Sequence, residues 1–217
     1  MKASGSKEKI LKRIRKALEQ KVPQPFSNID NQTGIYAQHT EGLEMTFARN
    51  FTGLGGHFMY CEDTKELVEA LQVLINEKGW KSIACREENF NRLLEQKKID
   101  AQIVTGAAQE IEGVDAGITY CEALIARTGT ILLSSALQSG RVGSILPPVH
   151  IIIAFTSQVI SDIKDGLQLM KERYPNQLPS MINFATGPSR TADIEKTLVV
   201  GVHGPKEVYV YLVDETI

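Results

Sequence analysis

A run of small, hydroxyl-bearing and charged residues near the C-terminus has the parts of an anion-binding turn. The run reads, in order, Gly187, Pro188, Ser189, Arg190, Thr191, Ala192, Asp193, Ile194 and Glu195. Free backbone amides at a helix start attract anions, and arginine binds carboxylate or phosphate in a bidentate way. With a helical turn predicted at residues 192–194, the candidate ligand-binding residues are Gly187, Ser189, Arg190, Thr191 and Asp193. In the alternative, Ser189 or Thr191 only caps that helix while Arg190 pairs with Asp193 or Glu195, and the local chemistry favours neither.

A second set of candidates flanks a strand predicted at residues 130–133. Thr128, Gly129 and Thr130 lead into this strand, and Arg141 follows it in a flexible loop. Hydroxyl groups and a guanidinium near the ends of one strand suit the recognition of an anion. Arg141 either joins Arg190 at a shared anion or is a surface residue of its loop.

Histidine and glutamate supply the candidate catalytic groups. His203 stands between Gly201 and Gly204, where the glycines let backbone and ligand approach closely, and an imidazole titrates near neutrality. We therefore count His203 and Gly204 among the candidates for ligand binding as well. Glu122 and Glu195 are candidates for a nucleophilic carboxylate of the acyl-transfer kind. No histidines occur at H-x-x-x-H or H-x-H spacing, so we predict no metal site.

Composition restricts the classes of function. Among 217 residues, 24 Lys+Arg face 26 Asp+Glu, and a net charge of -2 gives no global field that would attract nucleic acid or an anionic membrane. No stretch approaches the roughly 18 apolar residues of a membrane span, so we expect a cytoplasmic protein. Cys61, Cys85 and Cys121 are too widely spaced for a metal motif or a disulfide framework, and we expect structural thiols. His150 begins an apolar strand and is expected to be structural too.

Short apolar runs alternate with helical patterns along the chain. Strands are predicted at residues 58–60, 82–85, 102–104, 117–119, 130–133, 150–155, 181–184 and 208–212. Helices are predicted from Thr64, as the cap, to Gly79, around residues 90–94, and over residues 160–170. This alternation indicates an α/β fold with a mostly parallel sheet and helices on both faces. Ligands are then expected at the carboxyl ends of strands, in the loops after Leu133, Phe155 and Phe184. The strand at residues 208–212 alternates in polarity, which suggests a sheet edge.

The chain divides into an N-terminal part, residues 1–57, and an α/β domain, residues 58–217. A basic amphipathic helix is predicted over residues 6–21, and it either packs on the domain or docks on an acidic partner surface. Prolines then end the helix, and a polar linker or wrapping arm extends to about residue 40. A short helix is predicted over residues 41–50.

The C-terminal run, taken with the stretch Gly201-Val202-His203-Gly204-Pro205, resembles the signature of the lactate utilization protein C family, the LUD-domain proteins also called the YkgG family. Residues 117–119, residues 128–130 and Pro147 followed by His150 fit the order of this family, so the resemblance spans about residue 60 to the end. Such proteins often carry an acidic residue directly before Thr-Gly-Thr, where this chain has Arg127. If the family uses that carboxylate, this chain has lost the activity or moved the function to Glu122.

The resemblance implies a fold similar to the NagB/RpiA/CoA-transferase-like superfamily and a role in bacterial-type metabolism. The chain would be a non-redox component of a system that oxidises L-lactate to pyruvate. It would carry no cofactor itself, with iron-sulfur clusters on partner proteins, and would bind a small anionic ligand at the turn of residues 187–195. The alternative is a free-standing enzyme that acts on a CoA thioester or a sugar phosphate. That alternative rests on the same turn and on the chemistries of the superfamily.

Overall fold

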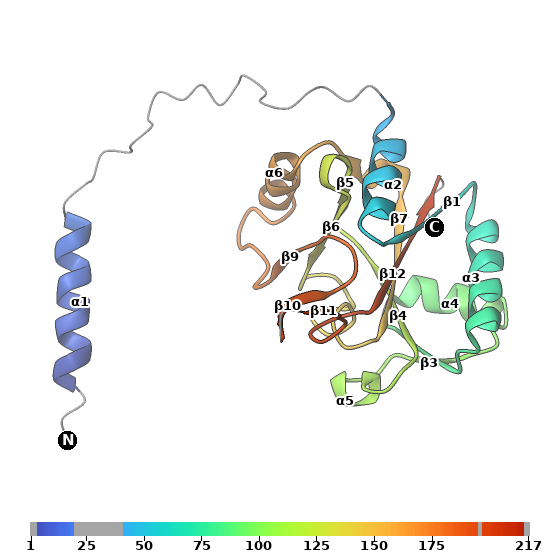
Figure 1. The fold of residues 1–217 in the computed structure, drawn as a ribbon, viewed down its shortest axis with the longest axis horizontal. Coiled ribbons are helices and arrows are strands. Elements are labelled where there is room, and N and C mark those ends of the chain that lie inside the picture. The colour runs from blue at the N-terminus through green and yellow to red at the C-terminus, as the bar shows by residue number, and fades with distance from the viewer. Residues whose placement is uncertain (1–3, 20–40, 195–196, 215–217) are drawn as a thin grey trace. The chain divides into compact units, whose positions relative to one another are not determined.

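The computed structural model describes residues 4–19, 41–194 and 197–214, so the predicted linker of residues 22–40 lies outside the described residues (Figure 1). The chain divides into two compact units, Met1–Gln38 and His39–Ile217. Helix α1 (Ser4–Glu19) of the first unit confirms the predicted basic helix. No described helix is long and apolar enough to cross a bilayer.

The second unit contains the remaining described elements. Its helices are α2 (Leu43–Gly53), α3 (Thr64–Lys78), α4 (Glu88–Gln96), α5 (Ala108–Ile111) and α6 (Ile163–Arg173), with the 3-10 helices η1 (Ala126–Thr128) and η2 (Thr156–Gln158). Its strands are β1 (His57–Cys61), β2 (Ser82–Cys85), β3 (Gln102–Val104), β4 (Ala116–Tyr120), β5 (Ala123–Ile125), β6 (Thr130–Ser134), β7 (Val149–Phe155), β8 (Val159–Ile160), β9 (Ile182–Ala185), β10 (Arg190–Ile194), β11 (Thr197–Val200) and β12 (Glu207–Val213). Helix α2, which the sequence analysis assigned to the N-terminal part, belongs to this unit.

A six-stranded parallel sheet in the order β1-β12-β7-β4-β2-β3 forms the centre of the unit. Its inner strands are apolar on both faces, as a parallel sheet requires; in β7 the residues from Ile151 to Ala154 are fully buried. A second sheet, β8-β5-β6-β9, is mixed, and β10 pairs with β11 in a separate antiparallel ribbon. The α/β class with a mostly parallel sheet is confirmed.

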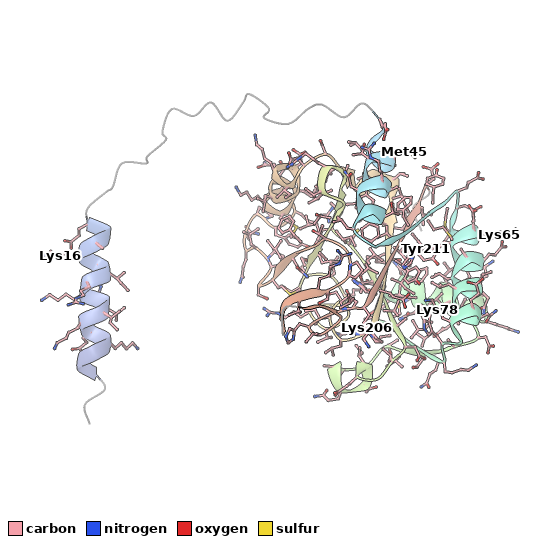
Figure 2. The ribbon with its side chains drawn as sticks, in the orientation of Figure 1. Lys16, Met45, Lys65, Lys78, Lys206 and Tyr211 are labelled. Atoms are coloured by element: carbon pink, nitrogen blue, oxygen red, sulfur yellow. The ribbon has the colours of Figure 1, made fainter. Side chains whose placement is uncertain are left out.

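The two faces of the central sheet are covered differently (Figure 1). Helices α3 and α4 pack on one face, through side chains such as Leu71 and Phe90. On the other face α2 shares the cover with the second sheet, where Phe47 and Phe51 meet Leu124 and neighbouring residues. Helix α6 packs on the second sheet through Met170. The space between the layers is filled, as Figure 2 shows for buried Tyr211, whereas Met45 of α2 and Lys65 of α3 point outward.

Helix α3 shows how local sequence defines an element. Asp63, and not Thr64 as predicted, is its N-cap: the Asp63 carboxylate accepts a hydrogen bond from the backbone N–H of Glu66 at 2.8 Å. From the position before the helix, an aspartate oxygen can accept a hydrogen bond from a free amide of the first turn. The helix therefore begins at Thr64, one residue earlier than predicted. Gly79 ends the helix with a φ of 69°, as predicted, because glycine adopts the left-handed conformation without strain.

Three further predictions are wrong. Strand β12 lies inside the sheet, between β1 and β7, and not at an edge. Tyrosine suits this position because its ring can be buried while its hydroxyl keeps a partner, as the Tyr209 hydroxyl does by donating to Glu207 at 2.7 Å. Residue Ile160 belongs to β8, and the last long helix begins only at Ile163. The predicted helical turn at residues 192–194 is part of β10, whose pairing with β11 suits the β-branched residues of both strands.

Candidate functional site

A cavity of about 250 Å³ brings together four of the residues predicted to bind a ligand, which are Gly187, Ser189, His203 and Gly204. Four polar residues that the sequence analysis had not assigned to a ligand site line it as well, namely Ser144, His150, Asn183 and Thr186. We call this space the Ser144 cavity. It joins the turn of residues 187–189 with the glycine-flanked histidine, and these two segments are the ones that carry the family resemblance.

The Ser144 cavity lies between the two sheets. One side comes from the central sheet, where His150 and Val208 stand near the amino ends of β7 and β12. The other side comes from β6 and β9, through Leu133 and Asn183. Residues after Leu133 and Phe184 thus contribute to the cavity, which for the central sheet is at the amino end rather than the carboxyl end.

The turn of residues 187–189 is held by its neighbours. The Ser189 N–H donates to Pro205 O and the Ser189 carbonyl accepts from Gly201 N–H, both at 2.9 Å. Gly187 has a φ of 80°, a conformation that favours glycine. The Thr186 hydroxyl contacts the Thr130 hydroxyl at 2.8 Å, which ties this turn to the start of β6. The turn is thus fixed in position beside the cavity.

His150 is a neutral, buried imidazole in the lining of the cavity. Its exposed fraction is 2%, and its Nε2 atom lies 2.8 Å from the Thr119 hydroxyl oxygen. Burial lowers the pKa of His150 from 6.5 to about 3, because the charged ring would lose its hydration. The burial of His150 and its contact with Thr119 agree with the expected structural role. The sequence did not indicate that this residue also lines the cavity.

The Ser144 hydroxyl is a buried group of the cavity lining without a partner among the described residues. The residue is 6% exposed, and its Oγ atom has no hydrogen-bond partner among the described residues. A buried hydroxyl without a partner costs on the order of 1–3 kcal/mol, so such groups are normally paired with protein, water or ligand. Ser144 lines the cavity, but its Oγ atom is itself covered, so the side chain must rotate before the hydroxyl can bond to an occupant.

The two predicted arginines do not meet. The Arg190 guanidinium donates to the carbonyl of Leu54, in the turn after α2. The Arg141 guanidinium donates to the Ser180 hydroxyl at 2.8 Å, before the start of β9, whereas Arg190 follows the end of that strand. Neither side chain lines the Ser144 cavity. The two guanidinium groups thus bond to different segments, and the structure gives them no common partner among the described residues.

Of the remaining predicted residues of the C-terminal run, Thr191 lies in β10, opposite Val199 of β11. Glu195 and the side chain of Asp193 are outside the described residues.

A profile of the LUD domain matches residues 44–213, which include every element from β1 to β12 and most of α2. The chain belongs to the LUD domain family. "Lactate utilization protein C" of Bacillus subtilis (strain 168) is 38% identical over 109 residues, which are 49% of this chain and 45% of that protein. The protein of the same name from Geobacillus kaustophilus (strain HTA426) is 32% identical over 197 residues, or 86% of this chain and 77% of that protein.

The match with the Bacillus relatives thus spans about half of their length. Among solved structures, a DUF162 family protein from Deinococcus radiodurans is similar, with a TM-score of 0.59 at 20% identity over 79% of this chain and 96% of that chain. This likeness shows that the LUD domain fold is shared.

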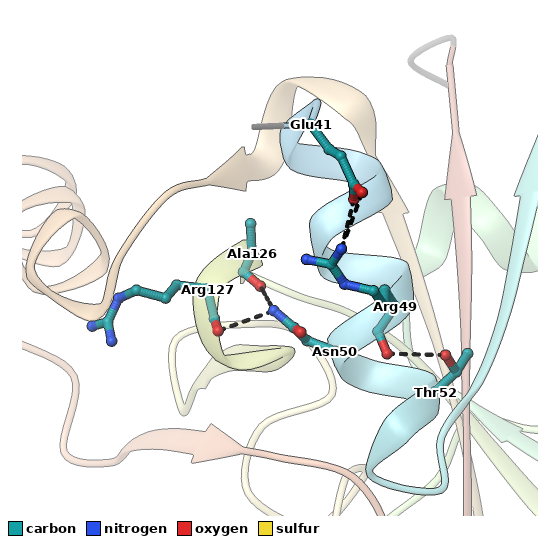
Figure 3. A network of polar contacts seen from close by, with 6 residues as sticks. All are labelled: Glu41, Arg49, Asn50, Thr52, Ala126 and Arg127. Carbon is teal, nitrogen blue, oxygen red and sulfur yellow. Dashed lines mark hydrogen bonds and ion pairs between the residues drawn. The ribbon is translucent and has the colours of Figure 1, made fainter. Parts of the chain in front are cut away.

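The Thr-Gly-Thr segment of this LUD domain packs against α2 rather than lining the cavity. The Asn50 amide donates to the carbonyls of Ala126 and Arg127 at 2.9 and 3.0 Å (Figure 3). Gly129 lies so close to α2 that an added Cβ would be 2.5 Å from the Phe51 nitrogen. The Thr128 hydroxyl is buried and has no partner among the described residues. Of the three predicted residues only Thr130 contacts the lining, through Thr186.

Arg127 and Glu122 both have structural partners in this LUD domain. The Arg127 guanidinium binds the Asp162 carboxylate at the start of α6 through two nitrogens, one of them at 2.9 Å, and this hydrogen bonding lowers the pKa of Asp162. Glu122 is fully buried and accepts hydrogen bonds from Ser134, Arg173 and Tyr174. The geometry gives Glu122 no contact with the Ser144 cavity.

The lining of the Ser144 cavity presents hydrogen-bonding groups that suit a small polar molecule. Hydroxyls from three serine and threonine residues, the Asn183 amide and the His203 ring line it together with the glycine turns. Such donors bind a carboxylate by hydrogen bonds when water is excluded. Among the described residues no group of three or more His, Cys, Asp or Glu side chains has the arrangement of a metal site, and Cys61, Cys85 and Cys121 are buried and unpaired.

Proposed function

We propose that this LUD-domain protein takes part in lactate utilization, as a non-redox component of a system that oxidises L-lactate to pyruvate with iron-sulfur proteins as partners. Its relatives over most of the chain are named lactate utilization protein C, which supports the first part of the proposal. The partners follow from the family resemblance, and the wide spacing of the cysteines agrees with clusters carried by other polypeptides.

Within this system the chain binds a small anionic ligand in the Ser144 cavity. The observation that carries this step is that the turn of residues 187–189, His203 and Ser144, whose hydroxyl is buried and unpaired among the described residues, line one cavity. About 250 Å³ suits a small carboxylate, and the donors named above would replace its water shell. The neutral His150 contributes a polar wall without a charge.

The ligand is tested by thermal unfolding of the full chain with L-lactate and with pyruvate. A ligand at about 100 times its Kd stabilises the folded state by roughly 2.7 kcal/mol, which raises the melting temperature by several degrees. We expect Ser144→Ala to reduce this shift, and Ser135→Ala to retain it, because Ser135 bonds Ser180 outside the cavity. Stabilisation only by CoA esters or sugar phosphates would favour the free-standing enzyme, and equal shifts in both variants would contradict the Ser144 cavity as the site.

The partners are tested in cells that grow on L-lactate. Affinity purification of the tagged full chain is expected to recover iron-sulfur proteins, and deletion of its gene is expected to impair growth on L-lactate but not on a sugar. Purification from sugar-grown cells is the matched control. Consistent absence of iron-sulfur partners together with normal growth of the deletion strain would contradict the proposed role.

A further inference from the structure

Strand β1 is an outer strand of the central sheet, and it contains no lysine, arginine, aspartate or glutamate (Figure 1). It reads His57-Phe58-Met59-Tyr60-Cys61 and pairs with β12 without a bulge. The Met59 and Tyr60 side chains are 44% and 45% exposed. Exposed edge strands of native proteins are usually protected by charges, prolines or bulges, because their free backbone groups can pair with another strand. Strand β1 has none of these protections.

The pairing with β12 shows which backbone groups of β1 point outward. The Cys61 carbonyl accepts from the N–H of Asp214 at 3.1 Å, one residue beyond its register partner Val213. Backbone groups alternate in direction along a strand, so every second residue back from Cys61 bonds to β12. The N–H and C=O groups of Phe58 and Tyr60 therefore point to the free edge. Among the described residues these four groups have no hydrogen-bond partner.

An apolar groove of about 400 Å³ lies beside this edge, between β1 and α3. Its lining includes Met59 of β1 and Ala70, Val73 and Leu74 of α3. The Val73 side chain is 56% exposed although it is aliphatic. Among the described residues that line the groove, Glu77 is the only one with a carboxylate, and none is a lysine or arginine. An exposed apolar surface next to an unprotected strand edge indicates an interface.

We propose that β1 pairs with β1 of a second copy of this chain, antiparallel and about a two-fold axis at Met59. In this register Phe58 exchanges two hydrogen bonds with Tyr60 of the second copy, and Tyr60 exchanges two with Phe58 of the second copy. All four outward groups of each copy are then bonded, and the two central sheets join into one.

Three properties of the edge favour a second copy as the occupant. The outward residues Phe58 and Tyr60 lie symmetrically about Met59, so in the antiparallel direction the edge matches itself, donor to acceptor. A second β1 also brings no lysine, arginine or carboxylate to the apolar groove. Finally, a stable interface buries about 800 Å² on each partner, which is more than a short strand supplies alone. The groove provides further apolar area, because Met59 of the second copy reaches the space beside Val73.

This interface uses none of the residues that line the Ser144 cavity, so it does not depend on the function proposed above.

Analytical ultracentrifugation of the full chain tests the assembly. We expect twice the mass of one chain at protein concentrations of about 10 to 100 µM, the range in which an interface of micromolar Kd is occupied. The mass of a single chain throughout this range would overturn the proposal.

Substitutions at the axis locate the interface. Met59→Lys places two ammonium groups opposite each other and is expected to weaken the dimer by about a hundredfold. Leu167→Lys is the matched control, because Leu167 is also 44% exposed but belongs to α6, which packs on the second sheet. Met59→Lys and Met59→Glu are each expected to be monomeric alone and to dimerise when mixed, since opposite charges then meet. A Met59→Lys dimer as stable as that of the unmodified chain would refute the pairing.

Tyr60→Pro tests the hydrogen bonds between the strands. It removes an outward N–H but none of the bonds to β12, and proline is tolerated at such positions of edge strands. We expect its dimer to be weaker by about tenfold than that of Tyr60→Ala, which keeps the N–H group. Thermal unfolding checks that each variant is folded. Equal dimer affinities of the two variants would contradict pairing through the backbone of β1.

Discussion

Replacing Glu122 with alanine is expected to lower the free energy of unfolding by about 3 kcal/mol, the lower end for removing one partner of a buried ion pair. The carboxylate is fully buried and accepts from the Ser134 hydroxyl at 2.5 Å, from the Tyr174 hydroxyl at 2.8 Å, and from Arg173. Without it these donors lose their acceptor. The loss stays at the lower end because the Arg173 side chain is 41% exposed and can reach water. Urea unfolding at neutral pH measures the change.

The control is Glu69→Ala, because Glu69 is 68% exposed and lies 3.9 Å from Lys65 in a surface pair. A pair of this kind contributes between 0 and about 1 kcal/mol, so the control should barely move the unfolding curve. Comparing the two variants also tests the role of Glu122, which was a candidate nucleophile in the sequence analysis. Unchanged stability of Glu122→Ala combined with lost function would show that the carboxylate acts on a ligand rather than on the fold.

The strands of the central sheet were predictable because they are buried on both faces. Runs such as Ile151-Ile152-Ile153 contain no polar position, and this pattern indicates a strand whatever its neighbours are. The position of β12 was not predictable in the same way. Its alternating tyrosines resemble a half-exposed strand, and only the pairing with β1 and β7, far away in sequence, shows that the rings are buried.

The candidate site was predictable in its turns and not in its arginines. Gly187, Ser189, His203 and Gly204 meet in one cavity because two glycine-containing turns lie side by side. Arg190 has the right chemistry for an anion, yet its side chain leaves the turn toward Leu54, since β10 is a strand and not the helix that would have directed the amides to a ligand. The direction of the Arg190 side chain depends on whether residues 190–194 form a strand or a helix, and they form a strand because they pair with β11.

The groups missed from sequence have a common cause. Ser144 has an ordinary sequence context, and its significance arises only from its place in the cavity lining and its burial without a partner. Burial of a polar atom is a property of the packed layers, so no local pattern reports it.

Replacing Gly129 with alanine is expected to lower the free energy of unfolding by about 3 kcal/mol, through two effects that add. Gly129 has a φ of 60°, and a side chain in this left-handed region costs about 1 kcal/mol. The new Cβ would also stand 2.5 Å from the Phe51 nitrogen and 2.8 Å from the Asn50 carbonyl carbon. These are backbone atoms of α2, so the helix must shift, and overpacking of this kind costs about 1–3 kcal/mol.

Gly79→Ala separates the two effects. Gly79 has a φ of 69°, but an added Cβ there would meet no atom within 4 Å, so only the conformational cost of about 1 kcal/mol remains. We expect denaturant unfolding to show Gly129→Ala as less stable than Gly79→Ala by about 2 kcal/mol. The glycine of the Thr-Gly-Thr segment would then be required because α2 approaches η1 closely, where Asn50 holds the carbonyls of Ala126 and Arg127. Equal destabilisation of the two variants would show that α2 can shift without loss of stability. A role of Gly129 in the approach of a ligand would then explain the glycine better.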